Sequence, residues 1–187
     1  MRKIYTAIYS RNSVLEAKES AKIAQKGEWK EYFGRLQLRA ATLTTGDDHR
    51  ELVMSLTPAE CYKLSLVIKQ IVKNGGRKVA ILHKPNQEEE RYTEVVVEKW
   101  ENNGRSGYAI ILQIRTKENG RDRIELKINV PVDKVELLAF ADFLQGLNTL
   151  LRWRGAVKVE SGGEEPEETP PEEPVEINDD DLDDIDL

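Results

Sequence analysis

The chain contains one cysteine, two histidines and two methionines among 187 residues, and these low counts exclude several classes of protein. Cys61 alone cannot form a disulfide within the chain, and no cysteine and histidine residues have the spacing of a zinc site. No apolar run is long enough to span a bilayer, and the N-terminus lacks a signal-peptide core. We therefore expect a cytoplasmic protein with no metal, no cofactor and no membrane association.

Side chains that could form a catalytic site are also sparse. His49 lies in a charged turn and His83 at a strand end, and neither has a recognisable nucleophile or metal partner nearby in the sequence. The glycines after Asn74 are not followed by the Lys-Ser/Thr pair of a phosphate-binding loop. The sequence therefore predicts a protein that is not an enzyme.

Basic residues are missing from the C-terminal part of the chain. No Lys or Arg follows Lys158, whereas 14 of the 34 acidic residues lie in 159–187. Residues 1–158 then carry 28 basic and 20 acidic side chains, net +8, and the tail carries −14. A basic surface suits a polyanion such as nucleic acid, although charged faces often serve only solubility.

The tail has a composition that does not fold alone. Residues 166–174 alternate prolines with glutamate pairs, so we expect the folded domain to cover 1–158 and a disordered Pro/Glu linker and docking tail to cover 159–187. Residues 178–187 are an acidic run with spaced apolar residues. This run is interpreted either as a solubilising tail or as a partner-docking peptide made of Asp179, Asp180, Asp181, Leu182, Asp183, Asp184, Ile185, Asp186 and Leu187.

The body contains one supersecondary unit twice, in residues 1–76 and 77–158. The segment 32–39 (YFGRLQLR) is echoed by 108–115 (YAIILQIR) at a spacing of 76 residues. In each unit a charged turn and a further strand follow, and Leu52, Met54 and Leu56 are matched to Leu126, Ile128 and Val130. Earlier strands are expected at 3–9, 78–83 and 92–100, whereas around 13–17 a strand is only a guess because 19–25 equally suits a helix.

A helix closes each unit. Thr57, Pro58 and Glu60 form a strong helix start, and Asp133 is the expected cap of the second helix. The apolar stripes are predicted at Leu64, Val67, Ile68 and Ile71 on the first helix, and at Val135, Leu138, Ala141 and Phe143 onward on the second.

The predicted fold class is α+β, with two β-β-β-β-α repeats forming two antiparallel sheets and the helices packed between them. Strand alternation directs Leu36, Leu38, Leu112 and Ile114 towards the helices. The residues between them, Arg35, Gln37, Arg39, Gln113 and Arg115, then lie on the opposite sheet faces.

This pattern resembles the Whirly family of single-stranded-DNA-binding proteins over roughly residues 3–154. The segment 131–136 (PVDKVE), the helix after it and the closing 152–155 (RWRG) are similar to the family's Pro-Val-x-Lys-x-Glu helix start and Gly-Trp end. Lys84-Pro85 also resembles its His-Asp-Pro. The family's Lys-Gly-Lys-Ala-Ala-Leu signature falls on 10–15 (SRNSVL), where both lysines are missing, and this departure puts the associated higher-order assembly in doubt.

Binding of a single strand needs aromatic platforms for bases and cations for phosphates. Phe33 and Tyr108 could equally be core residues, whereas Trp29 and Trp100 stand among charges. The predicted interface consists of Arg11, Lys26, Trp29, Lys30, Tyr32, Arg35, Gln37, Arg39, Lys84, Lys99, Trp100, Arg105, Tyr108, Gln113 and Arg115.

The sequence supports three functional hypotheses. The first is a nucleoid-associated protein that binds single-stranded DNA with little sequence specificity, protects it in replication, recombination or repair, and recruits replication or repair proteins through its tail. The acidic tail resembles those of bacterial-type single-stranded-DNA-binding proteins, although it ends in Asp-Leu and not Pro-Phe. The alternatives are a transcription regulator or coactivator that binds melted promoter DNA and a non-DNA interaction scaffold. RNA as a ligand is left open. Exposed sheet edges predict a homo-oligomer, and the resemblance implies a tetramer.

Overall fold

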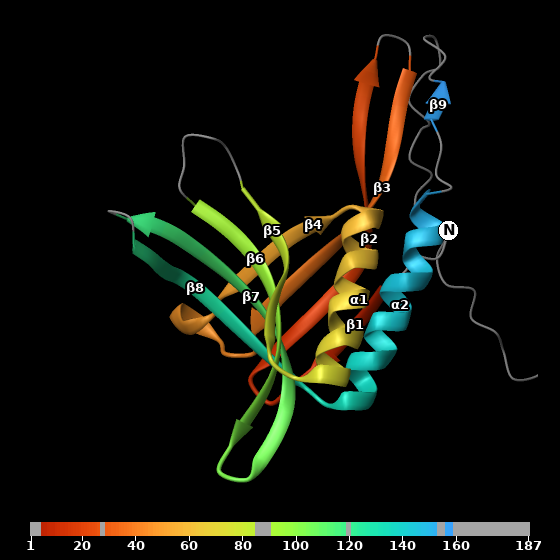
Figure 1. Ribbon diagram of the computed structural model, residues 1–187. Coiled ribbons are helices and arrows are strands. Elements are labelled where there is room, and N and C mark those ends of the chain that lie inside the picture. Colours follow the sequence, from red (N-terminus) through yellow and green to blue (C-terminus); the bar gives the residue numbers. More distant parts are fainter. Residues whose placement is uncertain (1–4, 27–28, 85–90, 119–120, 153–155, 159–187) are drawn as a thin grey trace, which may run out of the picture.

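The computed structural model describes residues 5–26, 29–84, 91–118, 121–152 and 156–158; for 21–26, 29–33, 118, 148–152 and 156–158 it describes the backbone alone. In each half of the chain four strands are followed by one long helix, which is the predicted order (Figure 1). The elements of the first half are β1 (Tyr5–Tyr9), β2 (Ser13–Lys26), β3 (Trp29–Thr42), the 3-10 helix η1 (Gly46–Asp48), β4 (Glu51–Leu56) and α1 (Pro58–Asn74). Those of the second half are β5 (Arg77–His83), β6 (Arg91–Asn102), β7 (Arg105–Glu118), β8 (Arg121–Val132) and α2 (Lys134–Arg152). The short strand β9 (Ala156–Lys158) follows α2.

Each half forms its own antiparallel sheet, in the order β1-β2-β3-β4 and β5-β6-β7-β8. The spacing of 76 residues found in the sequence also relates the strand registers: Glu16 pairs with Arg39, and the equivalent Tyr92 pairs with Arg115. The predicted α+β fold with two β-β-β-β-α repeats is confirmed. The open question at 19–25 is settled in favour of a strand, because β2 continues to Lys26 along β3.

One core joins the two halves. Leu15 and Leu36 of the first sheet, Leu112 of the second, Leu64 of α1 and Leu137 of α2 are all fully buried in it. Each helix contacts strands of both sheets, and the two helices lie side by side (Figure 1). The faces of the sheets that point away from the helices are called the outer faces below.

The predicted apolar stripe of α2 was wrong at Val135 and right at Ala141, and the predicted match of the fourth strands was wrong by two residues. Val135 is 76% exposed, and Leu137 is buried in its place, because residues two apart point about 200° away from each other on a helix. The buried stripe is Leu137, Phe140, Ala141, Leu144 and Leu147. The fourth strands are also shifted by two residues from the predicted match, since Leu38 pairs with Met54 and its equivalent Ile114 with Leu126. A shift of two residues preserves the faces.

The helix starts were predicted correctly. The Thr57 hydroxyl accepts from the Glu60 backbone N–H at 3.3 Å, and a Glu60 oxygen accepts from the Thr57 N–H at 2.8 Å, which completes a capping box. Asp133 Oδ1 accepts from the backbone N–H groups of Val135 and Glu136 at 2.7 and 2.9 Å. None of the described helices is long and apolar enough to cross a membrane.

Two long hairpins extend beyond the rest of the fold. Hairpin β2–β3 and its equivalent in the second half, β6–β7, project in opposite directions (Figure 1). The turn of β6–β7 has positive φ at Asn103 and Gly104, as a tight hairpin requires. Strand β9, which the sequence did not reveal, pairs with the outer part of β3, where Lys158 faces Trp29 in register.

Candidate nucleic-acid interface

The outer face of the first sheet carries two exposed tyrosines on its edge strand. Tyr5 is 51% exposed and Tyr9 is 64% exposed, and both lie on the face opposite the buried Ile8 of β1. Alternation along this short strand predicts their side, but they are not among the residues predicted to bind. The pattern that could have revealed them is the alternation of the strand, which places both aromatic residues on the face that does not carry Ile8.

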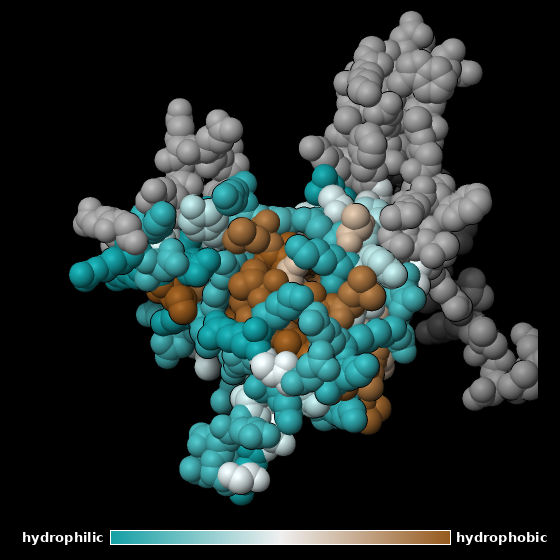
Figure 2. Space-filling view, in the orientation of Figure 1, coloured by the Kyte–Doolittle hydropathy of each residue, from teal (hydrophilic) through white to brown (hydrophobic). Residues whose placement is uncertain are grey.

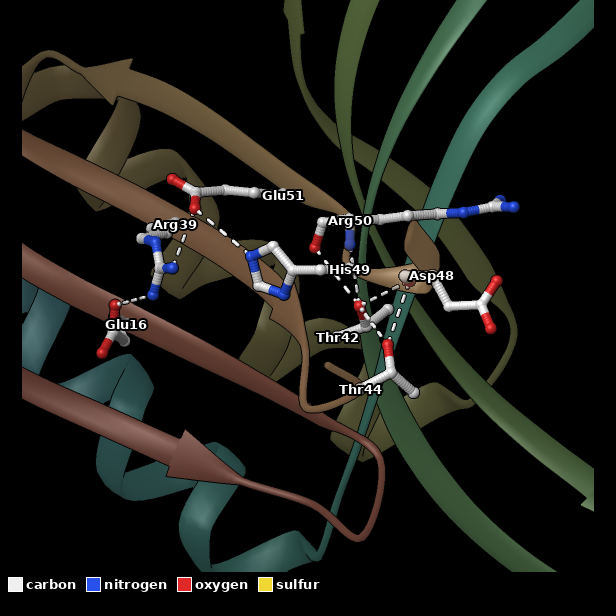
Figure 3. A network of polar contacts seen from close by, with 8 residues as sticks. All are labelled: Glu16, Arg39, Thr42, Thr44, Asp48, His49, Arg50 and Glu51. Atoms are coloured by element: carbon white, nitrogen blue, oxygen red, sulfur yellow. Dashed lines mark hydrogen bonds and ion pairs between the residues drawn. The ribbon is translucent and has the colours of Figure 1, made fainter. Parts of the chain in front are cut away.

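Arg39 of β3 lies on the same outer face, between Glu16 and Glu51 at one end of a polar network (Figure 3). Its guanidinium donates to Glu16 at 2.6 Å and to Glu51 at 2.8 Å. The hydrogen bond from Arg39 is the main cause that holds the pKa of both carboxyl groups below its usual value. Tyr5 donates to Glu16 at 3.0 Å, and burial together with this bond raises the pKa of Tyr5 to about 12. The predicted phosphate ligand Arg39 is therefore already neutralised by two acids.

The second repeat neutralises its equivalent arginine in the same way. Arg115 donates to Glu94 at 2.6 Å and to Asp122 at 3.2 Å. Gln113, predicted to face a ligand, is on the outer face as expected but is only 3% exposed, and its amide nitrogen donates to Glu94 at 2.7 Å. Sequence spacing cannot reveal such pairing, because Glu94 lies on another strand.

Trp100 lies on the outer face of the second sheet. It packs against the buried residues Val96, Ala109 and Ile111, and its indole N–H donates to the Tyr108 carbonyl oxygen at 3.2 Å. The Tyr108 side chain is on the opposite face and packs against the main core. Of the two roles left open for Tyr108, the structure favours the core, and it places Trp100 among the outer-face residues.

The remaining predicted cations are spread over both halves. Lys84 Nζ lies 5.6 Å from the ring centroid of Tyr92, a third aromatic that sequence reasoning missed. Arg11 and Arg105 are exposed, and Lys99 pairs with Glu101 at 3.4 Å. Arg35 is half-buried on the outer face of β3, and no ion pair to it is found among the described residues.

Four more of the residues predicted to bind lie on the β2–β3 hairpin. The strands carry Lys26, Trp29, Lys30 and Tyr32, but the side chains of these residues lie outside the described part of the structure. The tail residues 159–187 lie outside the described residues as well. Gln37 is half-buried on the outer face, opposite Lys18.

Cys61 and His83 lie in surroundings that suit a structural role. Burial raises the pKa of the Cys61 thiol to about 12, which keeps it protonated and unreactive at neutral pH. His83 Nε2 lies 2.7 Å from Glu60, the residue that closes the capping box. Within the described ranges no group of three His, Cys, Asp or Glu side chains could hold a metal ion.

The surface in Figure 2 is largely hydrophilic, with its apolar residues gathered over β5 and α1. The exposed apolar residues of these elements are Val79 and Leu82 on β5 and Tyr62 and Leu66 on α1. Val79 and Leu82 pair with β6 at positions that belong to the outer face. The outer face of the second sheet thus combines apolar, aromatic and basic side chains.

Comparison with solved structures identifies this arrangement of two sheets and two helices. A structure described as the plant transcriptional regulator PBF-2 superposes with a TM-score of 0.56 and 20% sequence identity, covering 81% of this chain and 84% of that one. WHY1 from Arabidopsis thaliana gives a TM-score of 0.50 and 19% identity, covering 82% and 86%. The chain has the Whirly fold. No protein-family model and no curated protein matches the sequence.

In the Whirly fold both helices pack between the two sheets, so they do not cover the outer faces. Because α1 and α2 cover the inner face of each sheet, the outer faces remain as the broad surfaces for a ligand. Fold similarity at 19–20% identity does not carry the ligand over. The function must therefore be argued from the side chains on those faces.

Proposed function

We propose that this protein binds single-stranded DNA through the outer faces of its two sheets, with little sequence specificity. The observation that carries the proposal is the exposure of aromatic residues on these faces, Tyr5 and Tyr9 above all, with the exposed Lys18 paired with Tyr5. Bases stack on aromatic rings whatever their identity, and cations attract the phosphates. Duplex DNA hides its bases within the stack, so exposed rings on a broad face favour single strands.

The same arrangement suits a protein that protects exposed strands in replication, recombination or repair. The domain carries net +8, and the acidic tail of net −14 follows directly after β9. Since β9 pairs with β3, Lys158, the residue that precedes the tail in the sequence, pairs with Trp29 in the predicted basic and aromatic segment of that hairpin. The tail competes with DNA for the basic domain and, once displaced, recruits replication or repair proteins through Leu182, Ile185 and Leu187. We place this activity in the cytoplasm, at the nucleoid, in a homo-oligomer, with a tetramer implied by the Whirly resemblance.

A second candidate is regulation of transcription at melted promoter DNA. It is supported by the description of the superposed PBF-2 as a plant transcriptional regulator. Both functions use the same outer faces, and they differ in the DNA that recruits the protein. A non-DNA scaffold remains the third reading, in which the basic domain meets an acidic protein.

Binding of one labelled oligonucleotide as a single strand and as a duplex tests the DNA-binding functions against the scaffold. The proposal predicts tighter binding of the single strand by tenfold or more, with affinity that falls steeply as salt rises, because phosphate contacts release counterions. Because melted promoter DNA is itself single-stranded, preference for the duplex contradicts both DNA-binding functions, and absence of binding to both forms supports the scaffold. Either result contradicts the first proposal.

The role of the tail has its own test. Deletion of 176–187 should raise DNA affinity at low salt and abolish capture of partner proteins, because it removes seven acidic side chains and all three apolar anchors. A matched variant in which only Leu182, Ile185 and Leu187 become serine should lose partners while keeping the wild-type affinity. A deletion with unchanged behaviour in both assays returns the tail to a solubilising role.

A further inference from the structure

The outer face of the second sheet buries a carboxylate at a position where the first sheet does not. The Glu94 side chain is only 1% exposed, although it lies on the face away from the helices. At the equivalent position, 76 residues earlier, the first repeat has Lys18, which is exposed. The same strand pair therefore folds without a buried acid.

Burial of a charge is costly even when it is paired, and an apolar replacement is often as stable or more stable. Its presence in one repeat and its absence from the other indicate a role beyond folding. Glu94 accepts from Gln113 at 2.7 Å and from Arg115 at 2.6 Å, so it fixes the orientation of both side chains. Together these three residues are called the Glu94 cluster.

The Glu94 cluster leaves hydrogen-bonding capacity unused. Gln113 is 97% buried, yet its Oε1 atom has no hydrogen-bond partner among the described residues, and the same is true of Arg115 Nε. One open acceptor and one open donor thus lie on neighbouring outer-face side chains of β7. An unfilled pair of this kind is expensive to bury, and a ligand that supplies both partners removes the cost.

The surroundings of the Glu94 cluster fit a nucleobase. Tyr92 pairs with Arg115 from β6, and Ile124, which is 48% exposed, pairs with Arg115 from β8. These side chains provide a ring and an apolar contact for a flat molecule next to the open donor and acceptor. Lys127 pairs with Gln113 across the strands and is exposed, and its long side chain can move to admit a ligand.

Building on the proposed function, we propose that the Glu94 cluster is a base-reading subsite that favours adenine and cytosine, whose exocyclic amino group lies next to a ring acceptor. The subsite has more spare acceptors than donors, because each Glu94 oxygen accepts one bond and retains a free lone pair beside Gln113 Oε1. Adenine and cytosine present an amino donor next to a ring acceptor, whereas thymine presents a single N–H. The protein then binds strands generally and selects the base at one position.

The test is the ratio of affinities for oligo(dC) and oligo(dT) of equal length, measured by fluorescence anisotropy with the full chain. Replacement Gln113→Leu removes the open acceptor, and this ratio should fall at least about fivefold, with oligo(dA) following oligo(dC). Gln113→Met serves as a second variant of similar size in case Gln113→Leu fails to fold. The control is Gln145→Leu on α2, an exposed glutamine that does not lie on an outer face, which should leave the ratio unchanged.

A ratio that stays at the wild-type value in a folded Gln113 variant overturns the subsite. An equal loss of affinity for all three homopolymers does the same, because a purely structural role acts on every strand alike. Failure of the wild-type protein to bind any homopolymer is a different result, since it overturns the proposed function itself.

Discussion

The indole of Trp100 occupies the space that a β-carbon at Gly107 would fill. Trp100 pairs with Gly107 across β6 and β7, and a Cβ at residue 107 would lie 2.6 Å from Trp100 Cζ2 and 2.9 Å from Cε2. The glycine therefore lets the ring lie against the backbone of β7. The hydrogen bond from the indole to the Tyr108 carbonyl holds it there, so one aromatic surface of the outer face is fixed before any ligand binds.

Replacement of Gly107 by alanine should force Trp100 out of this position. We expect a loss of about 1–3 kcal/mol in the free energy of unfolding, measured with urea, because the neighbouring ring must shift by more than a few tenths of an ångström. Gly146→Ala is the control: nothing lies within 4 Å of a β-carbon there, and alanine in a helix should add about 0.5–1 kcal/mol. Equal effects of the two substitutions would contradict the close packing of Trp100 on Gly107.

Tyr9 offers the clearest test of base stacking, because it is the most exposed of the aromatic side chains that the structure describes on the first sheet's outer face. Tyr9→Leu should weaken binding of a single strand by about 1–3 kcal/mol, with little change in stability. Tyr9→Phe keeps the ring and should keep the affinity. If both variants bind as wild type, Tyr9 is not a stacking platform.

Two arginines on β3 should differ in their response to salt. Arg35→Gln should lower the slope of log K against log salt by about 0.7, the contribution of one phosphate contact to a single strand. Arg39→Gln should leave the slope unchanged, since Glu16 and Glu51 already neutralise this guanidinium. Anisotropy titrations at several salt concentrations decide between them, and a larger change for Arg39 would show that its acids release it to DNA.

Arg39 should also affect the stability of the folded protein in acid. Arg39 lowers the pKa of Glu16 and of Glu51 below 4.5 in the folded state, so the unfolded chain takes up protons first as pH falls. The contribution of these bonds is present above pH 4.5 and is lost progressively below it. Arg39→Gln should flatten this decline in urea midpoints between pH 7 and pH 3, and Arg35→Gln should not. Parallel declines in all three proteins would contradict the pairing.

The sequence predicts the fold well and the binding surface less well, for physical reasons that particular residues illustrate. The 76-residue repeat and the alternation at Leu36 and Leu112 report local periodicity, and both survive in the registers of the sheets. The pairing of Arg39 with Glu16 and of Arg115 with Glu94 depends on contacts between strands, which periodicity does not contain.

Short elements and single helical turns also escape sequence analysis. Strand β9 has three residues and gains its hydrogen bonds from β3, so nothing in its own composition marks it. The error at Val135 arose because apolar residues occur on two sides of the first turn of α2, and only the packing against the sheets selects Leu137. Among the aromatics, Tyr5 and Tyr9 were missed because their exposure depends on which face the helices cover.

Photo-cross-linking is the most direct test of the claim that the outer faces bind single strands. An oligonucleotide that contains 5-iododeoxyuridine is irradiated with the full chain, and the cross-linked peptides are identified by mass spectrometry. The proposal predicts cross-links in β1, around Tyr5 and Tyr9, and in β6, around Tyr92 and Trp100. Cross-links confined to α1 and α2, or none at all, would contradict it.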